Sequence, residues 1–128
     1  MTNTVGRLAV TALFAVVALI APLDSEVPHF ALTGSAPAAG STVASVDEIR
    51  LTFSQVPQAN SVSVRLVTAG GDLVETSALE SDPSDGTIVF VGVDTHLDNG
   101  TYTVAWRGIG DDGHVVSGDF AFTLAAQR

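Results

Sequence analysis

Short runs of alternating polar and apolar residues recur from residue 29 onward, separated by stretches rich in turn-forming residues. In each run, apolar residues two positions apart share one face of an extended chain, which is the pattern of a half-buried β-strand. The separators are residues 69–72, 82–86 and 98–100, where glycine and asparagine supply positive φ angles. The predicted strands are residues 49–54, 61–67, 87–93, 101–106 and 119–124, with further strands at 30–34, 42–46 and 73–77.

Regular short strands of this kind predict an all-β domain, an immunoglobulin-like Greek-key β-sandwich of about seven or eight strands. A chain of 128 residues with 46% hydrophobic content can build one modest core but not two ordinary domains. We therefore expect one domain over residues 29–128. Trp106, Phe120 and Phe122 lie in strand-like runs and are expected in its core.

Composition removes several classes of site and partner. The 14 acidic residues outnumber the 5 basic ones, and the formal net charge of −9 argues against nucleic acid as a partner. The chain has no cysteine, so disulfides, thiolate metal sites and cysteine nucleophiles are excluded. The single methionine is Met1. Any metal site must therefore use nitrogen and oxygen ligands.

Residues 1–28 have the layout of a secretory signal. Arg7 gives a positive start, residues 8–20 are apolar except for Thr11, and Pro22 and Asp24 follow. No A-x-A pattern precedes His29, so an uncleaved signal-anchor helix remains an alternative to a cleaved signal peptide. We expect export to the periplasm or the outer face of the cell membrane, with membrane contact only if the signal stays uncleaved.

Two motifs at opposite ends of the predicted domain carry a family resemblance. The first is HFALTGSAPAAG at residues 29–40; the second is GTYTVAWR at 100–107 followed by DGHVVSGDFAF at 112–122. Together they resemble the CopC/PcoC family of exported copper-binding proteins. The resemblance covers residues 29–124, although the middle of the chain matches only in its strand pattern. It implies the same immunoglobulin-like sandwich.

The resemblance also implies a Cu(II) site. In proteins similar to this one, the residue matching His29 is amino-terminal and chelates one Cu(II) through its amine and imidazole, and residues matching Asp112 and His114 complete the site. On an extended segment Asp112 and His114 would point to the same face. Two imidazoles and a carboxylate suit a tetragonal Cu(II) centre. Pro28 puts the free amine in doubt, and Phe30 replaces the small residue that often follows the leading histidine.

The implied function is copper resistance or homeostasis, with sequestration of Cu(II) or its delivery to a CopD-like membrane copper importer. We expect a monomeric binding protein and not an enzyme. One alternative is an oxidative copper enzyme, because polysaccharide-cleaving monooxygenases also use an amino-terminal histidine. A second is an immunoglobulin-like structural or adhesion module in which the histidines bind nothing.

Individual residues also have plainer interpretations. Without the resemblance, residues 111–113 would be a turn and His114 a surface residue. His96 matches no ligand position of the family and is interpreted as a surface histidine. Arg107 either faces solvent, makes an ordinary surface ion pair, or contacts Asp112 from outside the ligand set.

Overall fold

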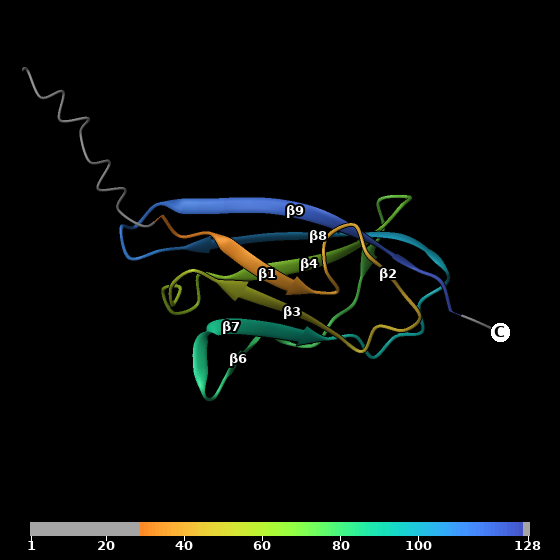
Figure 1. The fold of residues 1–128 in the computed structure, drawn as a ribbon, viewed down its shortest axis with the longest axis horizontal. Coiled ribbons are helices and arrows are strands. Elements are labelled where there is room, and N and C mark those ends of the chain that lie inside the picture. The colour runs from red at the N-terminus through yellow and green to blue at the C-terminus, as the bar shows by residue number, and fades with distance from the viewer. Residues whose placement is uncertain (1–28, 127–128) are drawn as a thin grey trace, which may run out of the picture.

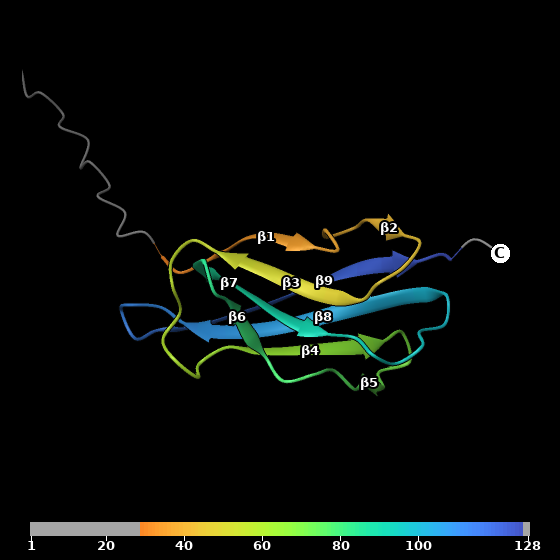
Figure 2. The same ribbon diagram turned by 90° about the horizontal axis from the view of Figure 1, so that it is seen from below.

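The computed structural model describes residues 29–126, which fold into two β-sheets packed face to face. Figures 1 and 2 show the two layers from directions 90° apart. The strands within this range are β1 (Leu32–Ala36), β2 (Thr42–Val43), β3 (Glu48–Phe53), β4 (Ser63–Thr68), β5 (Leu73–Val74), β6 (Glu80–Asp82), β7 (Asp85–Gly92), β8 (Gly100–Ile109) and β9 (Val115–Leu124).

One sheet has four strands in the order β1-β3-β7-β6, and the other has five in the order β2-β9-β8-β4-β5. All neighbouring pairs are antiparallel except β2 and β9. The longest ladder joins β8 and β9, in register from Gly100 opposite Leu124 to Ile109 opposite Val115. These two ten-residue strands form a hairpin whose turn projects from one end of the sandwich (Figure 1).

The core lies between the sheets because one face of each long strand is apolar. In β3, residues Ile49, Leu51 and Phe53 are buried and alternate with half-buried polar residues. In β8, Tyr102, Val104 and Trp106 point inward in the same way. Burying each such side chain contributes about 1.5–3 kcal/mol. Among residues 29–126, the buried core extends from Phe30 to Leu124.

The predicted all-β sandwich is confirmed, with differences in detail. The described part of the chain has nine strands, two of which span only two residues. Residues 44–46 and 75–77, predicted to be extended, lie outside strands. Strand β6 was not predicted, because Glu80-Ser81-Asp82 has no apolar alternation. Trp106 and Phe122 are buried as expected, and Phe120 is partly buried against the core.

The proposed signal segment, residues 1–28, lies outside the described residues. Between residues 29 and 126, no helix has both the length and the apolar character needed to cross a membrane.

Candidate metal centre

The amino-terminal segment is attached to the sandwich through Ser54, at the end of β3. The Ser54 hydroxyl donates to the His29 carbonyl oxygen at 3.1 Å and accepts from the Ala31 amide at 3.0 Å. The Ser54 amide donates to the Ala31 carbonyl oxygen at 2.8 Å. Three hydrogen bonds to one residue therefore fix the backbone on both sides of Phe30, while the His29 side chain stays exposed.

Phe30 is a core residue that ties this segment to the far end of β8. Its side chain is 2% exposed, and its ring stacks on Phe53 with centroids 4.6 Å apart. Gly110 approaches it so closely that a Cβ placed on that glycine would lie 2.5 Å from the Phe30 Cβ. Glycine is therefore required at 110 for the segment at 29–31 to lie against the β8–β9 turn.

Two glutamines hold the β8–β9 turn from the chain that follows β3. The Gln58 side chain donates to the Gly110 carbonyl oxygen at 3.0 Å, and the Gln58 amide donates to the Ile109 carbonyl oxygen at 2.8 Å. The Asp111 amide donates to Gln55 Oε1 at 2.9 Å. These bonds cross more than fifty residues of sequence. They place the turn beside the amino-terminal segment.

Within the turn, Asp112 and His114 contact each other directly. The His114 amide donates to Asp112 Oδ1 at 3.0 Å, and His114 Nδ1 lies 3.0 Å from Asp112 Oδ2. Gly113 between them has a φ of 78°, a left-handed conformation that glycine adopts without strain. The Asp112 side chain is 31% exposed and that of His114 is 81% exposed. The turn thus presents a carboxylate and an imidazole, already paired, to solvent.

The hydrogen bond from the His114 amide, followed by that from its imidazole, lowers the pKa of Asp112 below the ordinary value of 3.8. The charge of His114 and then that of His29 add to this lowering of the pKa. His29 therefore lies within electrostatic range of Asp112, although no hydrogen bond joins its side chain to the pair. Asp112 is ionised at neutral pH, which is the state that a metal ligand requires.

The structure brings two of the three predicted ligands into contact and carries the third to the same end of the sandwich. In Figures 1 and 2 the described chain begins at the end where the β8–β9 turn projects. Among the described residues, no three histidine or carboxylate side chains converge closely enough to hold a metal ion as they stand. The expectation that Asp112 and His114 share an extended segment is wrong: residues 111–112 form a turn, and β9 begins only at Val115.

The other residues weighed in the sequence lie elsewhere. The His96 side chain is 91% exposed and 3.8 Å from Asp98, in the loop before β8. Trp106 contacts Phe53 edge-on in the core. Arg107 is exposed, and it makes no ion pair with any described residue. The supports that sequence reasoning missed are Ser54, Gln55 and Gln58, which carry no motif.

Comparison with known proteins identifies the family. The model of the CopC domain matches residues 32–125. The chain belongs to the CopC family. CopC from Methylosinus trichosporium OB3b superposes with a TM-score of 0.71 at 25% identity, covering 78% of this chain and 97% of that one. PcoC from Escherichia coli, described as a methionine-rich copper resistance protein, gives 0.68 at 26% identity, covering 76% and 99%. No curated protein matches the chain.

Membership of the CopC family gives this chain a copper-related role. The match begins at Leu32 and ends at Ala125, so it includes the β8–β9 turn with Asp112 and His114. His29 lies three residues before the match. The family match therefore includes the residues of the turn. It does not include His29, whose role depends on the docking of the segment at 29–31 described above.

Proposed function

We propose that this CopC-family protein is an exported, non-enzymatic protein that binds one Cu(II) through His29, Asp112 and His114. It would serve copper resistance or homeostasis, by sequestering the ion or delivering it to a CopD-like membrane importer. The observation that carries the proposal is the 3.0 Å approach of His114 Nδ1 to Asp112 Oδ2, on a turn that touches the segment bearing His29.

The spacing of this pair suits adjacent positions of a tetragonal copper centre. Two ligand atoms 3.0 Å apart, each bonded at about 2.0–2.1 Å, subtend about 95° at the metal, taking nitrogen–zinc bonds as the guide. Tetragonal Cu(II) prefers angles near a right angle between neighbouring ligands. A copper ion would replace the proton shared by Nδ1 and Oδ2, with a small rotation of both side chains.

The third ligand would be the His29 imidazole. Its backbone is held through the hydrogen bond from Ser54, whereas its side chain is exposed and carries no hydrogen bond to the turn. Rotation about the side-chain torsions of His29 would bring the ring toward Asp112. If the chain is cut after Pro28, the α-amine becomes a fourth donor. If it is not, three side-chain donors remain and binding is weaker.

The donor set favours Cu(II) over Cu(I). The chain has no cysteine and its single methionine is Met1, so the soft sulfur ligands that select Cu(I) are missing from the domain. PcoC is described as methionine-rich. We expect this protein to differ from PcoC in having no methionine site for Cu(I).

One observation favours the alternative of an immunoglobulin-like structural or adhesion module. No preassembled group of three ligands exists within residues 29–126. In that alternative the hydrogen bonds from His114 to Asp112 simply close the turn, as an aspartate does in many loops.

The test uses residues 29–128 with a free amino-terminal His29, beside a version that begins at residue 22. Each is titrated with Cu(II), followed by the fluorescence of Trp106, the only tryptophan, and by electron paramagnetic resonance. We expect His114→Ala and Asp112→Asn to weaken binding at least about tenfold, which is 1.4 kcal/mol. The exposed His96→Ala is the matched control and should bind as the parent does. Equal losses in His96→Ala and His114→Ala, or no loss in either, would favour the module without a metal site.

A further inference from the structure

Charge is divided unequally between the two sheets. The strands of the four-stranded sheet contain four carboxylates, Glu48, Glu80, Asp82 and Asp85, and one arginine, Arg50. The only charged residues in the strands of the five-stranded sheet are Arg65, Arg107 and Asp119. In a chain with a formal net charge of −9, the strands of this second sheet therefore carry one more positive than negative side chain.

The arginines of the two sheets also differ in their partners. Arg50 is neutralised, because its guanidinium lies 3.2 Å from both Glu48 and Asp82 and covers the ring of Phe90 at 4.9 Å. The side chains of Arg65 and Arg107 form no ion pair or hydrogen bond with any residue between 29 and 126. Two guanidinium groups with all their donors free thus remain on a protein rich in carboxylates.

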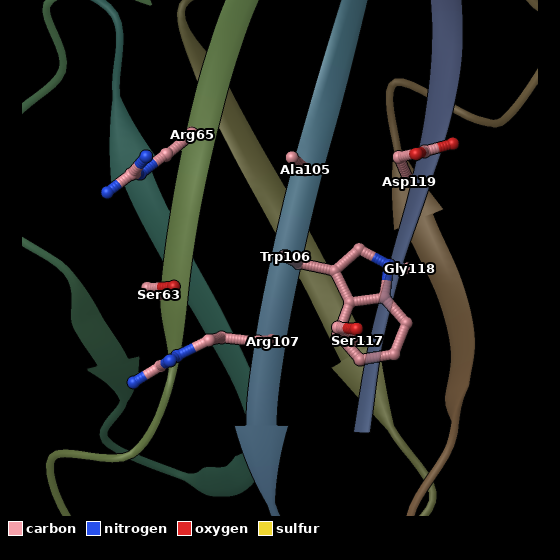
Figure 3. Close-up of a pocket in the computed structure, with 8 residues that line it drawn as sticks. All are labelled: Ser63, Arg65, Ala105, Trp106, Arg107, Ser117, Gly118 and Asp119. Atoms are coloured by element: carbon pink, nitrogen blue, oxygen red, sulfur yellow. The ribbon is translucent and has the colours of Figure 1, made fainter. Parts of the chain in front are cut away.

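Strand register brings these two arginines together. Arg107 on β8 lies opposite Ser63 on β4, and Arg65 lies opposite Ala105, so the two arginines are diagonal neighbours on the outer face. Diagonal neighbours on adjacent strands have Cα atoms about 7–8 Å apart, within reach of one carboxylate-bearing segment. Figure 3 shows both guanidinium groups extending toward the β4 side, away from Asp119 over β9. Ser63 and Ser117 line the hollow beside them.

Apart from Asp119, the outward-facing side chains of β8 and β9 that surround the arginines are mostly small and uncharged. Alternation along β8 and β9 directs these side chains outward, since most of their neighbours in sequence are buried or partly buried. They are Thr101, Thr103, Ala105, Ser117, Ala121 and Thr123. Leu73 and Val115, at opposite ends of the sheet, are 67% and 60% exposed. Protein interfaces are enriched in arginine and depleted in lysine and glutamate. The outer face shares these features, and Asp119 is the only carboxylate on β4, β8 and β9.

We propose that the outer face of β4, β8 and β9 around Arg65 and Arg107, the arginine face, docks an acidic segment of a partner protein. Carboxylates of the partner would accept paired N–H groups from each guanidinium, the geometry in which arginine binds carboxylates most strongly. The small side chains around the hollow leave room for an extended segment to lie across the strands. The face ends at Ile109 and Val115, next to the turn that bears Asp112 and His114.

Two other occupants are less well matched to this face. A single small anion would gain little, because both arginines are exposed and exposed ion pairs contribute little to affinity. A second copy of the chain would bring another net charge of −9, and a two-fold axis through the arginine face would oppose arginine to arginine. The arginine face contains none of the three proposed copper ligands, so the two proposals stand or fail separately.

The test is a titration of the ¹⁵N-labelled domain 29–128 with a capped peptide of six glutamates at low ionic strength. We expect saturable NMR shifts at the Nε–H groups of Arg65 and Arg107 and at neighbouring amides of β4 and β8. Because each exposed ion pair is worth a few-fold in affinity, Arg65→Gln/Arg107→Gln should bind the peptide about tenfold more weakly. Arg50→Gln, which removes the same charge from the opposite sheet, is the matched control and should bind like the parent.

Further arms separate the alternatives. Arg65→Lys/Arg107→Lys keeps the charge but loses the paired N–H donors of the guanidinium groups. Its affinity for the glutamate peptide should lie between that of the parent and that of the double glutamine variant. Amide dispersion and the midpoint of thermal unfolding check that each variant folds. Equal weakening in Arg50→Gln, or equal affinity for a lysine hexapeptide, would overturn the proposal. Free glutamate that binds as well as the peptide at the same carboxylate concentration would also overturn the proposal. Self-association of the parent in sedimentation, abolished in Arg65→Gln/Arg107→Gln, would overturn it too.

Discussion

Replacing Gly110 by alanine should weaken copper binding by displacing the segment that carries His29. An alanine Cβ at this position would lie 2.5 Å from the Phe30 Cβ and 3.2 Å from the Phe30 Cγ. Ordinary contacts between carbon atoms are about 3.5–4.0 Å, so the two backbones must separate by about 1 Å. The Phe30 Cβ cannot rotate away, because the backbone on both sides of it is bonded to Ser54.

Two contributions give the size of the effect: the cost of overpacking and the displacement of a ligand. Extra volume forced into a well-packed site costs about 1–3 kcal/mol of unfolding free energy, which is within reach of denaturant titration. Moving a ligand away from its partners without removing it typically lowers metal affinity about 10–100-fold. Gly110→Ala should therefore unfold at a lower denaturant concentration and bind Cu(II) about 10–100-fold more weakly, with fewer coupled nitrogens in the electron paramagnetic resonance spectrum.

Gly34→Ala is the matched control for this experiment. Gly34 lies on β1, close to the same segment, but a Cβ there would meet only Thr52 at 3.9 Å, an ordinary contact. It should leave copper affinity unchanged. A Gly110→Ala variant that loses stability yet keeps both the copper affinity and the nitrogen coupling of the parent would contradict this prediction. In that case His29 would bind no copper, or would bind it without a docked backbone.

Two further predictions concern pH. Burial, with a contribution from the charge of Asp98, raises the pKa of Tyr102 above 10.0, and its hydroxyl donates to the Asp98 carbonyl oxygen at 2.6 Å. The stabilising contribution of the Tyr102 hydroxyl is therefore fully present below pH 10 and is lost as the pH rises above that value. Tyr102→Phe should lower the free energy of unfolding by about 1 kcal/mol at neutral pH. In urea unfolding, this variant should also lack the parent's loss of stability at alkaline pH. Hydrogen bonds from the Ser84 hydroxyl and amide, and then from Arg50, lower the pKa of Asp82 from 3.8 to about 2. Its contribution is present above pH 3.8 and disappears as pH falls toward 2, so the thermal midpoints of Asp82→Asn and the parent should differ at pH 6 and converge near pH 2.

The fold was predictable wherever apolar residues alternate over a full strand. Ile49, Leu51 and Phe53 occupy alternate positions in sequence, and all three are buried. The pattern cannot find a strand whose formation depends on its neighbour alone. β6 is polar throughout, and it is a strand because Glu80 and Ser81 pair with β7 across a tight turn. A period-2 signal requires one buried face, which this edge strand lacks.

The sequence names candidate ligands for the site, but it does not reveal the side chains that support the turn. Asp112 and His114 lie close in sequence, and the turn brings their side chains into contact. Their role as metal ligands stays a prediction. Gly113 ends the extended conformation that was expected, since its positive φ turns the chain before β9. Gln55 and Gln58 could not be found from sequence. Their hydrogen bonds to the turn depend on how the two sheets pack, and glutamine has no characteristic spacing.

The arrangement also determines how a copper ion would be captured. Asp112 and His114 are paired before any metal arrives, so they lose little freedom on binding. His29 differs, because its backbone is fixed through Ser54 and the buried ring of Phe30 while its side chain is free. Closing the site would then order only the torsions of one residue, at about 0.5–1.5 kcal/mol for an immobilised side chain. We therefore expect the ion to meet the turn first and His29 to close over it, with the affinity depending most on whether cleavage after Pro28 adds the amine.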